Sequence, residues 1–163
     1  METIPDFEEM LALLERHGVR YLVIGGLAAI YHAKPRYTKD MDLWVGPDGS
    51  NVEKANRVLE AFPSPWLFEP GDVKQIVQIG VEPDRIDLIL DVQGTDFEQA
   101  WADRIRDTYG DVEVNWVDLE TLIRMKEPLT AARHVEDVRV LKRVRELRAK
   151  RRDAAPPHGT RGK

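Results

Sequence analysis

Apolar residues recur along the chain in two patterns, and each pattern predicts a different kind of element. Spacings of three and four residues place side chains on one face of a helix, whereas short continuous or alternating apolar runs are typical of strands. The helical pattern predicts helices over residues 5–17, 27–32, 51–62, 96–104, 119–126 and 134–150, with Ser50 and Asp118 as N-caps of the third and the fifth. The strand pattern predicts strands over residues 21–24, 41–45, 73–79, 85–90 and 112–117.

The order of these elements indicates a mixed α/β (α+β) fold, in which helices flank a sheet and a helical appendage follows at the C-terminal end. A chain of 163 residues is the size of one domain. We expect a core over residues 1–118 and C-terminal helices over residues 119–150 that pack on this core. Residues 151–163 combine basic residues with two prolines and two glycines, so we expect a disordered basic tail there.

Charge is distributed unevenly along the chain. Residues 142–163 contain nine Lys or Arg and two acids, a net charge of +7, so the rest must carry −12 to give the total of −5. Clustered basic residues favour contact with nucleic acid or with an acidic partner. The alternative is a solvated helix that runs into a charged tail.

The composition excludes several classes of site. The chain has no cysteine, which excludes disulfides, thiolate metal sites and cysteine nucleophiles, and its four histidines show no zinc-binding spacing. No segment approaches the ~18 consecutive apolar residues of a membrane helix. The acidic start of the chain lacks the apolar segment of a signal peptide. We therefore expect a cytoplasmic protein that is not associated with a membrane.

Three aspartates are candidate metal ligands. Asp40 and Asp42 open a predicted strand, and because side chains alternate along a strand, both point to the same face. Two neighbouring carboxylates repel each other unless a cation lies between them, and hard oxygen ligands suit Mg²⁺. Asp87 lies inside an apolar predicted strand, where burial of an isolated carboxylate is costly unless it is paired or bound to a metal. Solvated acids at a strand start and a partly exposed edge residue are the alternatives.

A glycine pair, Gly25-Gly26, follows a predicted strand and precedes a predicted helix, 14 residues before Asp40. Glycines at such a position let backbone N–H groups approach a phosphate, although a glycine pair also occurs in an ordinary tight turn. The glycine pair, Asp40-Met41-Asp42 and the third acid Asp87 together resemble the nucleotidyltransferase fold of the polymerase-beta type. Residues 36–42 resemble in particular the minimal nucleotidyltransferases related to AbiEii-type toxins of toxin–antitoxin systems. The resemblance covers about residues 5–92.

This resemblance implies transfer of a nucleoside monophosphate from an NTP to a nucleophile, with release of pyrophosphate. Asp40 and Asp42 would hold two Mg²⁺ ions, which can clamp the attacking and leaving oxygens of an in-line displacement. Asp87 would bind the catalytic ion and act as the base for the acceptor hydroxyl. Gly25 and Gly26 would hold the triphosphate through backbone N–H groups.

Further residues follow from the same resemblance. Arg36, Lys39 and Lys126 are candidates for neutralising phosphate charge, and the first two are equally ordinary as solvated loop charges. Lys126 and Asp137 are in register with a family segment that joins a helix lysine to a later aspartate, so Asp137 is a candidate site-orienting acid. The family's glycine, arginine and first aspartate in that segment are Thr130, Ala131 and His134 here.

Three functions remain open from the sequence. The first is an enzyme that transfers a nucleotide to RNA, such as a tRNA end, or to a protein, and that belongs to a toxin–antitoxin system. The second is a transferase acting on small molecules with aminoglycoside-like hydroxyls. The third is a non-catalytic module, such as an antitoxin that binds a partner and keeps a vestigial site. The three intact acids favour an enzyme.

Overall fold

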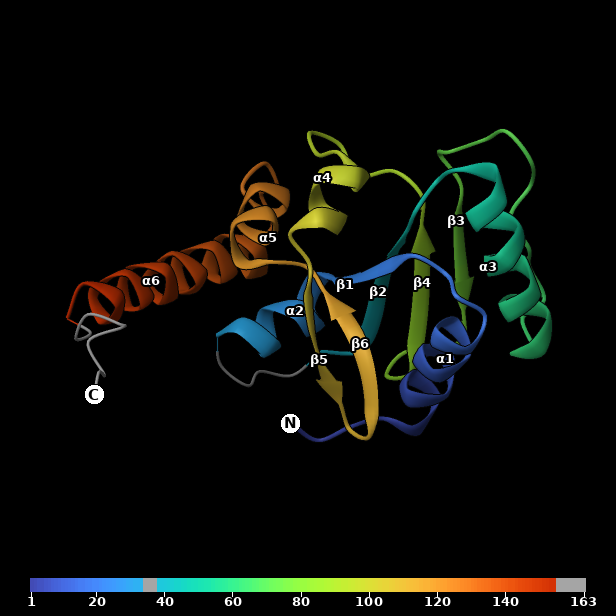
Figure 1. Ribbon diagram of the computed structural model, residues 1–163, viewed down its shortest axis with the longest axis horizontal. Helices are drawn as coiled ribbons and strands as arrows, with labels where there is room; N and C mark the ends of the chain where they lie inside the picture. Colours follow the sequence, from blue (N-terminus) through green and yellow to red (C-terminus); the bar gives the residue numbers. More distant parts are fainter. Residues whose placement is uncertain (34–37, 155–163) are drawn as a thin grey trace, which may run out of the picture.

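A six-stranded mixed sheet organises the chain, with the strand order β3-β4-β2-β1-β6-β5 (Figure 1). The structure is a computed structural model and describes residues 1–33 and 38–154. The strands are β1 (Tyr21–Ile24), β2 (Asp40–Val45), β3 (Ile76–Ile79), β4 (Arg85–Ile89), β5 (Ile105–Tyr109) and β6 (Val112–Trp116). Strand β2 runs antiparallel to β1 and parallel to β4, so β2 lies between two strands that are far apart in the sequence.

Helices cover both faces of the sheet (Figure 1). Helices α1 (Pro5–Arg16) and α3 (Gly49–Ala61) contact each other on one face. Helices α2 (Gly25–His32) and α5 (Leu119–Lys126) contact each other on the opposite face. The remaining helices are α4 (Phe97–Ala102) and α6 (Ala132–Ala154). Helix α6 contacts α2 and α5 and then extends away from the sheet.

One apolar core holds these layers together. Strand β1 is buried along its whole length because it lies in the middle of the sheet and is covered on both faces. On α1, Phe7, Met10 and Leu14 are fully buried at helical spacing. Full burial of one such side chain stabilises the fold by about 1.5–3 kcal/mol. The core thereby fixes β1, whose last residue leads into the candidate site.

The mixed α/β class is confirmed, and most predicted elements are present with shifted ends. The strand predicted over residues 73–79 begins only at Ile76, and the helix predicted over residues 96–104 ends at Ala102. Strand β5 was not predicted. Three of its five residues are exposed at the sheet edge, so its sequence lacks a clear apolar pattern.

Two predicted N-caps have different outcomes. Ser50 as a cap is wrong, because α3 begins at Gly49 and the side chain of Asp48 accepts a hydrogen bond from the backbone N–H of Asn51. Asp118 is confirmed as a cap, since its side chain accepts a hydrogen bond from the backbone N–H of Thr121.

The C-terminal segment is more helical than predicted. Helix α6 continues to Ala154, so residues 151–154 belong to a helix rather than to a disordered tail, whereas residues 155–163 lie outside the described residues. The division into a core over residues 1–118 and C-terminal helices over residues 119–150 stays a prediction. Across residues 1–33 and 38–154, no helix combines the length and the apolar character that crossing a membrane requires.

Candidate active site

Three carboxylates converge where β2 and β4 lie side by side. In this parallel pairing Asp42 is the register partner of Asp87, and Asp40 is the register partner of Arg85. Alternation along the strand places Asp40 on the same face as Asp42, and the in-register neighbour Asp87 shares that face. One oxygen from each of the three carboxylates lies within 4.8 Å of the other two. The three acids singled out from the sequence are therefore brought together.

The start of α2 lies against this cluster. Ile24, the last residue of β1, is the register partner of Asp42, and Gly25 follows it with a φ of +69°. A Cβ atom at Gly25 would lie 2.2 Å from Oδ2 of Asp42, so only glycine fits here. The first N–H groups of a helix have no partner within the helix and carry partial positive charge. Gly25 thus brings an anion-binding end of a helix next to the three acids.

Arg85 contacts two of the acids. Its Nη2 donates a hydrogen bond to Oδ2 of Asp40 at 2.7 Å, and its Nε lies 3.4 Å from Oδ1 of Asp87. The guanidinium therefore places one positive charge beside three carboxylates. The sequence contains a signal for this position, because Arg85 precedes Asp87 by two residues on a strand and must share its face. Arg85 was nevertheless not predicted as a site residue.

The carboxylates perturb one another electrostatically. Burial, followed by the nearby charges of Asp40 and Asp87, raises the pKa of Asp42 to about 7. Burial also raises the pKa of Asp87, an effect that Arg85 opposes and Asp40 reinforces. Raised pKa values mean that the fully ionised cluster lacks enough compensating positive charge.

The donor set fits a divalent cation. All three ligands are hard carboxylate oxygens, which Mg²⁺ prefers. Among the described residues, Oδ1 of Asp87 is buried without a hydrogen-bond partner, which is costly in a protein interior. Nε of Arg85 contacts this oxygen at 3.4 Å without a hydrogen bond, so a cation with two positive charges would still satisfy the oxygen and offset the excess negative charge. The cluster can therefore hold Mg²⁺.

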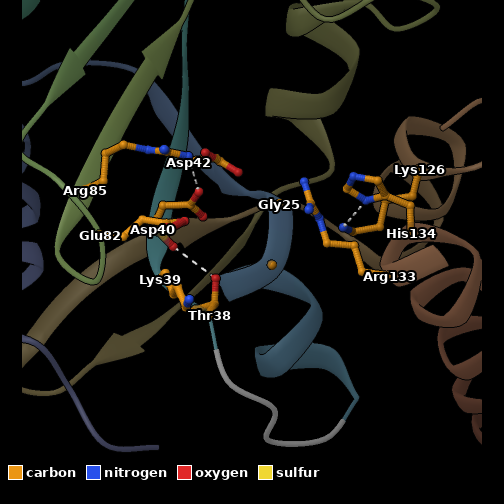
Figure 2. A pocket seen from close by; sticks show the side chains of 11 residues that line it. Gly25, Thr38, Lys39, Asp40, Asp42, Glu82, Arg85, Lys126, Arg133 and His134 are labelled. Carbon is orange, nitrogen blue, oxygen red and sulfur yellow. Dashed lines mark hydrogen bonds and ion pairs between the residues drawn. The ribbon is translucent and has the colours of Figure 1, made fainter. Parts of the chain in front are cut away.

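Asp40 and Asp42 line a cavity of about 430 Å³ (Figure 2), and Asp87 lies beside Asp42 through the pairing of β4 with β2. Figure 2 shows Asp40, Asp42 and Arg85 on one side and Lys126, Arg133 and His134 on the other, with Gly25 between the two groups. The cavity is lined by Gly25, Gly26, Thr38, Lys39, Asp40, Asp42, Glu82, Arg85, Lys126, Arg133 and His134. It combines carboxylates suited to a metal with cations suited to phosphate oxygens.

Lys126 reaches the cavity from a buried position. Its Nζ lies 3.0 Å from Oδ2 of Asp137 and 3.4 Å from Nδ1 of His134. The side chains of Lys126 and Asp137 are only 3% and 7% exposed. Because a buried charge without a partner is strongly destabilising, this pair fixes the ammonium at the cavity wall and ties α5 to α6.

The remaining predicted residues are placed as follows. Gly26 and Lys39 line the cavity, whereas Arg36 lies outside the described residues. Arg133 and His134 also line the cavity, although neither was predicted as a site residue. They lie at the start of α6, and the pairing of α6 with α5 brings them to the acids. Sequence spacing alone does not reveal that contact.

Comparison with known proteins finds similarity in structure only. No protein-family model and no curated protein matches the sequence. The antibiotic-resistance factor ANT(2'')-Ia is similar with a TM-score of 0.60 and 16% identity, over 91% of this chain and 90% of that one. The lincosamide antibiotic adenylyltransferase LnuA, bound to lincomycin, is similar with a TM-score of 0.61 and 15% identity, over 87% and 98%. A nucleotidyltransferase-like protein from Paracoccidioides brasiliensis is similar with a TM-score of 0.54 and 16% identity, over 87% and 75%.

Proposed function

The chain has the nucleotidyltransferase fold, and from this premise we propose that it transfers a nucleoside monophosphate from an NTP to an acceptor hydroxyl, with Mg²⁺ as cofactor. The convergence of Asp40, Asp42 and Asp87 within 4.8 Å, at a cavity that Asp40 and Asp42 line together with several cations, carries this proposal. A purely structural role gives no reason for three mutually repelling acids to share one face of the sheet.

In the proposed enzyme, Asp40, Asp42 and Asp87 hold Mg²⁺, and the sequence resemblance implies two ions. Bound Mg²⁺ neutralises charge on the triphosphate and on the oxygens that gain charge during transfer. Arg85 offsets part of the negative charge of Asp40 and Asp87 through the two contacts it makes with them.

The triphosphate binds at the start of α2. Gly25 and Gly26 line the cavity there, and helix N-termini bind anions through their free backbone N–H groups and the helix dipole. Lys39, Lys126 and Arg133 line the same cavity and neutralise the phosphate oxygens.

Transfer is an in-line displacement at the α-phosphorus. The acceptor hydroxyl oxygen forms a bond to the α-phosphorus while the bond from this phosphorus to the oxygen bridging to the β-phosphate breaks. Pyrophosphate leaves, and the hydroxyl proton passes to the carboxylate of Asp87. Asp87 suits this role because burial raises its pKa and so makes it a better proton acceptor than an exposed aspartate.

Two kinds of acceptor are candidates. The end of α6 exposes Arg148, Lys150 and Arg151, which suits contact with RNA phosphates. A role as a toxin–antitoxin component is proposed from the sequence resemblance alone. The structural neighbours point instead to small molecules, since LnuA is bound to lincomycin and ANT(2'')-Ia to adenylyl-2''-tobramycin.

Incubation with each of the four α-³²P-labelled NTPs, Mg²⁺ and separate acceptor pools tests the proposal. The pools are total RNA, an added protein extract, an aminoglycoside and a lincosamide. The control is the Asp40→Ala/Asp42→Ala variant, with its folding checked by circular dichroism. We expect label in one pool with the wild type only, and that pool identifies the acceptor class.

Two outcomes would contradict the proposed function. Equal labelling by the folded double variant would show that the two aspartates do not support transfer. No label in any pool, together with no binding of NTP or Mg²⁺ by calorimetry, would favour the non-catalytic, antitoxin-type module.

A further inference from the structure

A second cavity of about 530 Å³ adjoins the first one. The two cavities share Gly25, Asp42, Lys126 and His134 as lining residues, so the carboxylate of Asp42 lies at their common boundary. A molecule in the second cavity can therefore reach the site where nucleotide transfer is proposed. Its volume is within the range of about 300–1,000 Å³ typical of pockets for small molecules.

The second cavity differs from the first in its chemistry. Its apolar lining includes Ile24, Ile89, Val92, Leu122, Met125 and Leu129. Ile89 follows Asp87 by two residues on β4 and is the register partner of Trp44, which follows Asp42 by two. The apolar surface is thus a direct continuation of the face that carries the acids, covered by α5.

Charge argues against two acceptor classes for this cavity. Among the described residues, its only charged or titratable lining side chains are those it shares with the catalytic cavity: Asp42, Lys126 and His134. A polycationic sugar needs several acids around it, and an RNA backbone needs several cations. Away from the residues shared with the first cavity, the described lining of the second cavity has neither several acids nor several cations.

Its side chains also argue against a nucleobase as the occupant. No Phe, Tyr or Trp lines the cavity in the part of the chain that the structure describes. Proteins commonly bind bases by stacking them on aromatic side chains. An aliphatic lining suits instead an aliphatic or alicyclic body.

We propose that this cavity binds the acceptor, and that the acceptor is an uncharged molecule with an apolar body that places its hydroxyl beside Asp42. The inference rests on the proposed function and names its substrate class. The acceptor's hydroxyl oxygen bonds to the α-phosphorus, pyrophosphate leaves with its bridging oxygen, and the proton passes to the carboxylate cluster. The NTP occupies the first cavity at the same time.

The test uses the neutral apolar fluorophore N-phenyl-1-naphthylamine as a probe of the full chain. Leu129→Asp places a charge at the cavity, at a residue that is 44% exposed and so tolerates a polar side chain. Leu147→Asp on α6 is the matched control, since Leu147 is 48% exposed and does not line the cavity. Titrations are repeated with Mg²⁺ and saturating α,β-methylene analogues of the four NTPs, which cannot transfer a nucleotide.

We expect the wild type to bind the probe at one site, Leu129→Asp to bind it at least tenfold more weakly, and Leu147→Asp to stay within twofold. We also expect the probe and the analogues to bind together, with probe affinity changed less than threefold. Equal effects of the two variants would overturn the assignment of the cavity. Displacement of the probe by an analogue would show that the second cavity binds the nucleobase and would overturn the proposal. Calorimetry of the analogues alone separates these results from failure of the proposed function, which would appear as no nucleotide binding.

Discussion

Oδ2 of Asp42 occupies the space in which a side chain on Gly25 would begin. A Cβ atom there would lie 2.2 Å from that oxygen, and Gly25 has a φ of +69°. The pairing of Ile24 with Asp42 fixes the two residues relative to each other. Gly25 is therefore needed both for the positive φ of the backbone and to leave room for the carboxylate of Asp42.

We expect Gly25→Ala to reduce nucleotide transfer about 100-fold, because displacement of a catalytic group by about 1 Å has effects of that size. Gly18→Ala is the control, since Gly18 has a φ of +66° with nothing within 4 Å of an added Cβ. Both variants carry a backbone penalty of about 1–2 kcal/mol in the free energy of unfolding, measured by urea denaturation. Only Gly25→Ala should lose transfer in the labelled-NTP assay. Equal activity of the two variants would show that the glycine serves the turn alone.

The sequence predicted the acids because their signals are local. Residues two apart on a strand point to the same face of the sheet. A carboxylate in an apolar strand is costly to bury unless it has a cation or a hydrogen-bond donor beside it. These rules brought out Asp40, Asp42 and Asp87, and the structure places them within 4.8 Å of one another. The same rule, applied to Arg85, would have placed it beside Asp87.

Other features depend on contacts that have no local signal. Arg133 and His134 reach the cavity from the start of α6, where α6 packs on α5 and Asp137 pairs with Lys126. The second, apolar cavity forms between α5 and strands that are distant in sequence. Strand β5 lies at the sheet edge, where exposure removes the apolar pattern on which prediction depends.

The pKa of Asp42 predicts how stability depends on pH without a metal. Its ordinary value is 3.8, and the folded protein raises it to about 7, with burial as the first cause. Between these values the folded state binds a proton that the unfolded state has lost, so the free energy of unfolding falls as pH rises through this window. The fall attributable to Asp42 amounts to up to about 4 kcal/mol.

Asp42→Asn isolates this effect. We expect the variant to show a smaller fall than the wild type between pH 4 and pH 7 in urea denaturation with EDTA present. At pH 8, Mg²⁺ should stabilise the wild type and leave the variant nearly unchanged. The same pH slope in both proteins would contradict the raised pKa of Asp42.

Arg85→Met should expose the repulsion among the acids. We expect the free energy of unfolding of the metal-free variant to be about 1–3 kcal/mol lower than that of the wild type, because two charged contacts are lost. A fixed Mg²⁺ concentration should then raise its melting temperature more than that of the wild type, since no cation competes for Asp40 and Asp87. Arg106→Met, which removes contacts with Glu15 and Glu113, is the control and should leave the Mg²⁺ response unchanged. An equal Mg²⁺ response in all three proteins would exclude Arg85 from the acid cluster.

The buried pair of Lys126 and Asp137 joins α5 to α6, and Lys126 is also a candidate for binding phosphate. One set of variants can separate the effect on stability from the effect on NTP binding. The ion pair measures 3.0 Å and is almost fully buried, and Lys126 also lines the cavity that contains Asp40 and Asp42. Loss of one partner leaves a buried charge without its main counterion, which commonly lowers the free energy of unfolding by about 3–5 kcal/mol. The exposed pair of Lys142 with Glu127 serves as the reference for a surface contact.

We expect Lys126→Met and Asp137→Leu each to unfold at clearly lower urea concentration, and the double variant to be more stable than either single one, because an apolar pair replaces the buried charges. Lys142→Met should unfold like the wild type. Even so, we expect calorimetry to show that the double variant binds NTP with Mg²⁺ at least tenfold more weakly than the wild type does, since it lacks the Lys126 ammonium at the cavity wall. Wild-type NTP affinity in the folded double variant would mean that Lys126 only joins α5 to α6. If the single variants matched the wild type in stability, the buried pair would not be what holds the start of α6, with Arg133 and His134, at the cavity.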